Sequence, residues 1–196
     1  GTCAQAMAAG LGARAAVLDT NVDRLRELDL VFGNRIATLY SNTHAIDGAV
    51  RGADVVIGAV LVPGASAPRL VTREMISKMR AGAVVVDVAL DHDGCIETSH
   101  PTTHAPTHAQ PTYVVDGVVH YCVANMPGAV ARTSTFALGN ATLRHAIALA
   151  NKGWKRALAD DPYLRAGLNV CDGHVTHEAV ARALGLAYVH ADEMLD

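Results

Sequence analysis

Two carboxylates follow apolar runs of the sequence, where an acid can face a ligand. The β-branched run over residues 84–91 ends on Asp91, and a shorter run over residues 14–19 ends on Asp19. Both runs are typical of buried parallel strands. Ligands of open α/β sheets bind beyond the carboxyl ends of the strands, so both acids are candidates for a ligand site. Asp also caps turns and helices, so a purely structural role stays open for each.

The residues around Asp19 match the second half of a dinucleotide-binding fingerprint. A helix that opens at Gly1 is followed by a strand that ends on an acid about 20 residues later. In that motif the amino end of the helix binds pyrophosphate, and the acid binds the ribose hydroxyls. A carboxylate repels a 2′-phosphate, so Asp19 favours NAD over NADP. The first strand and first two glycines of the motif are absent, which predicts that the chain is a fragment.

Histidines gather in a loop rich in proline and threonine over residues 94–111. His100, His104 and His108 are four residues apart, and His92 is nearby. Prolines in the loop prevent a helix that would place these imidazoles on one face, and no cysteine or carboxylate completes a coordination sphere. We therefore expect solvated loop histidines and no metal.

Composition excludes several classes of protein. Of the 196 residues, 51% are hydrophobic and 18% are charged, which is typical of a globular chain. The net charge is −3 and the 16 Lys and Arg are scattered, so the footprint of a nucleic-acid-binding protein is missing. We find no apolar run near the roughly 20 residues of a membrane span and no secretory signal. The four cysteines are far apart, which predicts reduced thiols and a cytoplasmic protein.

Strand-like and helix-like runs alternate through the first half of the chain, which calls for crossover connections and a parallel sheet. The alternation covers residues 14–19, 21–30, 35–40, 42–51, 54–61, 72–79 and 84–91. Two further strand-like runs lie at residues 112–115 and 118–123. Helical segments then dominate, and they predict another layer or another domain.

The sequence closely resembles alanine dehydrogenase. The resemblance rests on HYCVANMPGAV at 120–130 with TST at 133–135, on VLVPGA at 60–65 and on VVVDVALD at 84–91. It runs from Gly1 to the carboxyl end and corresponds to rather more than half of the family's chain. The related alpha subunit of proton-translocating transhydrogenase is the nearest alternative.

The resemblance implies an α/β fold with two parts. Residues 1–127 would form a Rossmann domain that lacks its first strand, and the helices of residues 128–196 would return to a second, substrate-binding domain. Family members are NAD-dependent homohexamers that interconvert L-alanine with pyruvate and ammonia by hydride transfer.

The resemblance also implies roles for individual residues. Asp19 would bind the adenosine ribose as the acid of the fingerprint that Gly1 opens, with Arg24 beside the adenosine and Ser41 near the adenine. Asp91 would be the catalytic acid. The residues that line the cofactor cleft or surround the nicotinamide and substrate would be Val60, Leu61, Ala89, Leu90, Asn125, Met126 and Pro127.

One group of residues that the family needs is missing from the sequence. In the family, an Arg and a Lys neutralise the substrate carboxylate, and a His is the principal acid or base; all three precede the region that this chain matches. Asn125 can orient substrate without adding charge. We therefore expect the 196-residue chain alone to be at most a nucleotide-binding fragment without turnover.

Overall fold

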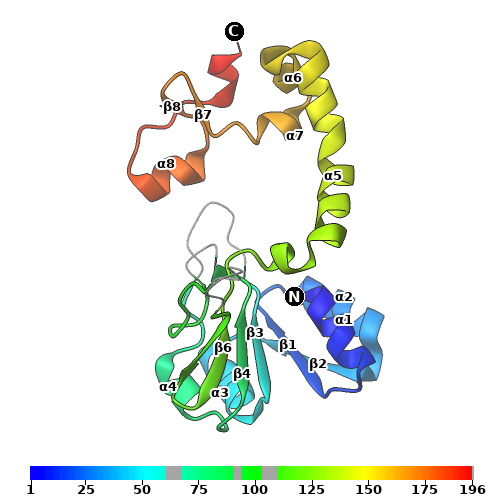
Figure 1. Cartoon of the computed structure of the whole chain (residues 1–196), viewed down its shortest axis with the longest axis vertical. Coiled ribbons are helices and arrows are strands. Elements are labelled where there is room, and N and C mark those ends of the chain that lie inside the picture. The colour runs from blue at the N-terminus through cyan, green and yellow to red at the C-terminus, as the bar shows by residue number, and fades with distance from the viewer. Residues whose placement is uncertain (61–67, 91–93, 103–109, 196) are drawn as a thin grey trace. The chain divides into compact units, whose positions relative to one another are not determined.

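The computed structural model describes residues 1–60, 68–90, 94–102 and 110–195. The chain divides into two compact units. Of the described residues, those up to Ala124 form the first unit and those from Asn125 onward form the second. Figure 1 labels their helices and strands.

A pair of parallel strands opens the first unit. Strand β1 (Ala15–Asp19) pairs with β2 (Ile36–Tyr40), and the register aligns Asp19 with Tyr40. Helices α1 (Thr2–Gly10) and α2 (Val22–Phe32) lie beside this pair (Figure 1). A short 3-10 helix, η1 (Gly33–Arg35), leads from α2 into β2. The buried side chains of Leu28, Phe32 and Ile36 form the core between α2 and this strand pair.

A four-stranded sheet in the order β3-β4-β6-β5 completes the first unit. Its strands are β3 (Val55–Gly58), β4 (Val84–Asp87), β5 (Thr112–Val115) and β6 (Val118–Tyr121), with helices α3 (Thr43–Gly52) before β3 and α4 (Arg73–Ser77) before β4. The three strands β3, β4 and β6 are parallel, and β5 is antiparallel to β6. Ile76, Val85 and Val118 are fully buried in the core of this sheet.

Strand β4 is shorter than the sequence predicts. The apolar run predicts a strand over residues 84–91, but β4 ends at Asp87. The reason is that the Asp87 carboxylate accepts a hydrogen bond from the backbone N–H of Ala89, at 3.1 Å, and so starts a turn. The prediction that Asp91 ends the strand is therefore wrong, and Asp91 itself lies outside the described residues.

Strand β5 departs from the expected parallel sheet, because it is antiparallel to β6. Asp116 and Gly117 connect β5 to β6, with φ angles of 52° and 80°. Positive φ at both central residues is the requirement of a type I′ two-residue hairpin turn, and Asp-Gly meets it well. This pair was a readable hairpin signal.

The second unit is mostly helical. A 3-10 helix, η3 (Met126–Val130), leads into the long helix α5 (Ala131–Lys152), which is followed by α6 (Trp154–Asp160) and α7 (Pro162–Arg165). A hairpin of β7 (Val170–Cys171) and β8 (His174–Val175) precedes α8 (Glu178–Leu184) and η4 (Ala191–Met194). Among the helices of the described ranges, none combines the length and hydropathy needed to cross a membrane.

Candidate functional site

Asp19 is placed at the carboxyl end of β1, as the sequence predicts. Its Oδ1 atom accepts a hydrogen bond from the backbone N–H of Asn21, at 2.8 Å. Asn21, not Asp19, is the N-cap of α2, because its side chain accepts from the N–H of Arg24. None of the ion pairs found among the described residues includes Asp19. The carboxylate at the strand end thus has no cationic partner among the described residues.

Arg24 connects α2 to the amino end of α1. Its guanidinium donates to Thr2 Oγ1 at 2.9 Å and forms an ion pair with Glu27 at 2.7 Å. Gly1 is the N-cap of α1, and no side chain caps this helix end. The structure therefore brings Gly1, Asp19 and Arg24 into one region, as the sequence predicts for the adenosine and pyrophosphate end of a dinucleotide site.

Ser41 joins the same region. It follows directly after β2, and its backbone N–H donates to the carbonyl oxygen of Asp19 at 2.9 Å. The pairing places Ser41 next to the ribose-binding candidate without using its hydroxyl. This position is compatible with the predicted place near adenine.

Three more predicted residues lie beyond the carboxyl ends of β3 and β4, which are neighbouring parallel strands. Val60 follows β3 and packs partly buried against the core, and Ala89 and Leu90 follow β4 and are buried. The N–H of Val88 donates to the carbonyl of Gly58 at 2.8 Å and holds the two strand ends together. Leu61 lies outside the described residues, as does Asp91.

Asn125 begins the second unit and shapes the turn that follows it. Its Oδ1 atom accepts from the N–H of Gly128 at 3.2 Å, which makes Asn125 the N-cap of η3. Met126 and Pro127 form the first residues of η3. These three predicted residues therefore share one capped turn, separate from the first unit that holds the other predicted site residues.

A cluster of stacked rings lies at the base of the histidine-rich loop. The ring of Tyr113 stacks on His100 at 3.6 Å between centroids and on His120 at 5.0 Å. The Tyr113 hydroxyl donates to the Thr98 carbonyl at 3.0 Å and accepts from the His100 N–H at 2.9 Å. Burial raises the pKa of Tyr113, and so does its hydrogen bond with Cys122. The phenol is therefore neutral and structural.

The spacing of the histidines in the same loop raises the question of a metal site. His100 is described and stacks on Tyr113, whereas His92, His104 and His108 lie outside the described residues. In the described part of the chain, no three His, Cys, Asp or Glu side chains gather as they would around a metal ion.

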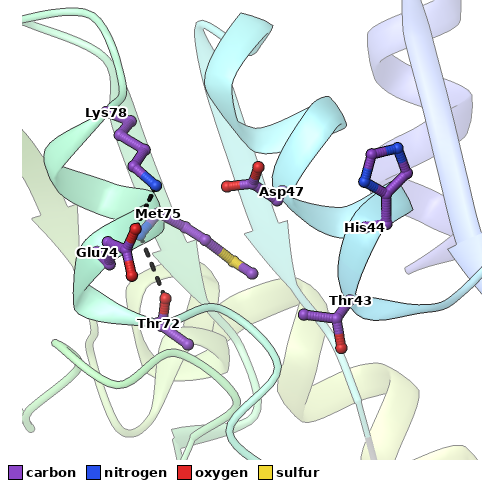
Figure 2. Close-up of a pocket in the computed structure, with 7 residues that line it drawn as sticks. All are labelled: Thr43, His44, Asp47, Thr72, Glu74, Met75 and Lys78. Carbon is purple, nitrogen blue, oxygen red and sulfur yellow. Dashed lines mark hydrogen bonds and ion pairs between the residues drawn. The ribbon is translucent and has the colours of Figure 1, made fainter.

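A groove of about 470 Å³ lies between α3 and the segment that opens α4. Figure 2 shows Met75 extending between the two helices, with Asp47 on one side and the Lys78–Glu74 pair on the other. Lys78 lowers the pKa of Glu74, and Arg51 lowers the pKa of Asp47, so both acids are ionised and paired. None of the predicted site residues lines this groove.

The described residues fit a nicotinamide dinucleotide at its adenosine end. A helix of nine residues starts at a glycine with no side-chain cap, so its first N–H groups and its dipole can bind pyrophosphate. An uncompensated acid ends the strand that follows this helix. Together they supply the partners that a pyrophosphate and a ribose diol require.

Comparison with known families agrees with this geometry. Residues 1–178 match the family model described as alanine dehydrogenase/PNT, C-terminal domain. The chain belongs to this family. The resemblance to alanine dehydrogenase that the sequence motifs carry is thereby confirmed, and the α/β fold of the family is the fold observed.

Relatives in the family match the chain over its full length. Alanine dehydrogenase of Halomonas elongata is 60% identical over 195 residues, which are 100% of this chain and 52% of that protein. Alanine dehydrogenase of Bacillus subtilis is 57% identical and is matched over 51% of its length. The chain spans about half the length of the curated relatives it matches.

Solved structures separate the two branches of the family. An L-alanine dehydrogenase superposes with a TM-score of 0.83 at 51% identity, covering 94% of this chain and 50% of that one. A transhydrogenase from Sinorhizobium meliloti superposes with a TM-score of 0.65 at 27% identity, covering 90% of this chain and 46% of that one. The chain is therefore more similar to the alanine dehydrogenase than to this transhydrogenase.

Two polar residues that the sequence did not single out are fully buried beside the candidate site. Asp87 ends β4, and His120 lies in β6. His120 Nδ1 is 3.0 Å from the Val118 carbonyl, and Nε2 is 2.7 Å from Thr98 Oγ1. With Nδ1–H donating, Nε2 accepts from the Thr98 hydroxyl, and the ring is neutral. A polar residue within an apolar strand was the available signal for both.

Burial lowers the pKa of His120, and His100 adds to this effect, while the Val118 carbonyl and Asp116 oppose it. The folded state binds this proton more weakly than the unfolded state does. The contribution of His120 to folding stability is therefore fully present above the ordinary histidine pKa of about 6.5, and it is lost as the pH falls below that value. We expect the thermal unfolding midpoint to decrease between about pH 7.5 and about pH 5.5, and to decrease less in His120→Gln.

His44→Gln is the matched control, because His44 is exposed on α3 in the same unit. It should keep the wild-type pH dependence. The same slope in His120→Gln and in wild type would show that His120 does not carry the effect.

Proposed function

We propose that this chain forms the NAD-binding part of an alanine dehydrogenase, which interconverts L-alanine with pyruvate and ammonia. The observation that carries the proposal is Asp19 at the end of β1, connected through Asn21 and Arg24 to the uncapped amino end of α1. Support comes from the 60% identity to the Halomonas elongata alanine dehydrogenase over the full chain.

The cofactor end of the proposed site is assigned residue by residue. Asp19 accepts hydrogen bonds from the ribose hydroxyls, and the N–H groups at Gly1 and after it bind the pyrophosphate. Arg24 lies beside the adenosine and Ser41 near the adenine. The bound NAD supplies the hydride acceptor of the reaction.

The reacting end is assigned to two turns. Asp91 holds the ammonium or amino group and moves its proton, and Asn125 orients the substrate without adding charge. The apolar residues exclude water around the nicotinamide. They are Val60, Leu61, Ala89, Leu90, Met126 and Pro127.

The proposal includes the domain organisation and the assembly. We assign residues 1–127 to the Rossmann domain and residues 128–196 to the substrate domain, a boundary three residues beyond the end of the first compact unit at Ala124. The protein is a cytoplasmic homohexamer. Two observations support this part: all four cysteines are free thiols, and α5 has no buried side chain although Phe136, Leu138 and Leu143 are apolar and exposed.

The test uses the full-length protein that contains this chain. NADH oxidation, followed by absorbance, should require both pyruvate and ammonium. The 196-residue chain alone should show no turnover. NADH oxidation that proceeds equally without ammonium contradicts the proposal. Hydride exchange between two nicotinamide dinucleotides, coupled to proton movement, favours a transhydrogenase-like function instead.

Replacing Asp91 separates catalysis from cofactor binding. In the full-length protein, Asp91→Asn should lower kcat by about 100-fold or more, as expected for loss of a proton-transfer group, with the Kd for NADH nearly unchanged. Asp54→Asn is the control, because Asp54 is exposed just before β3, at the opposite end of that strand. Undiminished turnover would remove Asp91 from the catalytic residues.

Replacing Asp19 tests the ribose assignment. Asp19→Asn removes the charge that repels a 2′-phosphate, a repulsion of roughly 1–2 kcal/mol, so the ratio of kcat/KM for NADP to that for NAD should rise about tenfold. Asp23→Asn is the control, since Asp23 is a nearby exposed acid that pairs with Arg26. Equal ratios in Asp19→Asn and wild type would count against the assignment.

A further inference from the structure

Asp87 is a fully buried carboxylate at the end of the central strand β4. Its Oδ1 atom accepts from the N–H of Ala89 at 3.1 Å. Its Oδ2 atom accepts from the N–H of Cys95 at 3.1 Å and from the N–H of Ile96 at 3.2 Å. One side chain therefore holds the chain on both sides of residues 91–93.

Other contacts tighten this arrangement. The N–H of Gly94 donates to the Ala89 carbonyl at 3.1 Å, so the backbone at these two residues is joined directly. The thiol of Cys95 donates to Asp87 Oδ1 at 3.8 Å. Burial and the charge of Asp87 raise the pKa of Cys95 to about 11, so this thiol keeps its proton.

Two glycines make room for the carboxylate. A Cβ at Gly94 would lie 2.5 Å from Asp87 Oδ2, and Gly94 has φ of 71°. A Cβ at Gly58, the last residue of β3, would overlap Cys95 Sγ and lie 3.2 Å from Asp87 Oδ1. The carboxylate is thus enclosed by backbone on both sides, which fixes its position.

The structure also argues that the residue must be a carboxylate. The ion pairs of the described residues leave Asp87 without a cation, so its oxygens depend on hydrogen bonds from three backbone N–H groups and the Cys95 thiol, and a buried carboxylate without such donors is costly. Asn has the same shape but one acceptor oxygen. Its amide NH2 would face either the Ala89 N–H or the N–H pair of Cys95 and Ile96, leaving donors opposed.

We propose that Asp87 is a positioning residue for turnover, because it fixes the backbone at Ala89 and at Cys95 and Ile96, on either side of residues 91–93. The proposal rests on the proposed function, because it takes Asp91 as the group next to the reacting carbon. As a positioning residue, Asp87 contacts neither substrate nor cofactor. It acts through the backbone on either side of Asp91.

The test is a double-mutant cycle in the full-length protein, with NADH oxidation by pyruvate and ammonium as the assay. Asp87→Asn should lower kcat by about 10- to 100-fold, because a displacement of the order of 1 Å costs this much, with the Kd for NADH nearly unchanged. In the Asp91→Asn background, Asp87→Asn should change kcat by less than about twofold, because the group it positions is already lost.

A merely structural role gives a different pattern. In that case Asp87→Asn lowers the unfolding midpoint but leaves kcat per folded molecule unchanged, or it lowers kcat by the same factor in wild type and in Asp91→Asn. Either result overturns the proposal. Ile76→Val is the control: it removes a methyl group from a fully buried side chain of α4, and it should lower the midpoint without changing kcat.

Gly94→Ala is the second variant, for use if Asp87→Asn does not fold. It keeps the carboxylate but forces it away from the Cys95 and Ile96 N–H groups, and it should show the same dependence on Asp91. A folded Gly94→Ala with wild-type kcat contradicts the proposal. Absence of pyruvate-dependent oxidation in the wild type would instead contradict the proposed function, so the two failures are distinguishable.

Discussion

The hydrogen bonds of the Asp87 carboxylate are the constraint on which the carboxyl edge of the main sheet depends. A buried charge without a cation is stable only where dipoles surround it, and here three backbone N–H groups do so. Those bonds end β4, turn the chain and return it at Cys95. The Cys95 carbonyl in turn accepts from the N–H of Leu70 at 2.8 Å, so the segment that follows residue 67 is tied to the same point. The end of β4 and the segment that begins at Leu70 therefore depend on the same side chain.

The adenosine end of the proposed site depends on a different principle, the parallel register of β1 and β2. That register brings Ser41 to the backbone of Asp19, and Arg24 links the following helix to the start of α1. Each of these contacts joins residues that are close in the sequence or that lie on neighbouring elements. Such contacts assemble from local folding of a βαβ unit. The spacing of the half fingerprint predicts Gly1 and Asp19, whereas the places of Arg24 and Ser41 come from the family resemblance.

The features that could be predicted from the sequence are those that local signals determine, such as the starts of helices. Asn42 and Thr72 cap α3 and α4 as their positions indicate, because each side chain accepts an N–H three residues later. The end of β4 could not be predicted in this way, since the bonds that end it include partners eight and nine residues away. His120 was missed because its buried state depends on Thr98, which lies in another segment and forms no part of the pattern of strand β6. The positions of Leu61 and Asp91 lie outside the described residues, so their part of the site rests on family resemblance.

The proposed reaction places a further demand on such an arrangement. Hydride transfer requires the reacting carbons near van der Waals distance, and a displacement of about 1 Å is enough to slow it greatly. Asn125 belongs to a turn of the second unit, fixed by its own cap on Gly128, whereas Asp91 follows a turn of the first unit, fixed by Asp87. Local hydrogen bonds therefore fix the backbone at Ala89, Cys95 and Ile96 in the first unit and at Gly128 in the second, so each unit builds its own turn independently of the other.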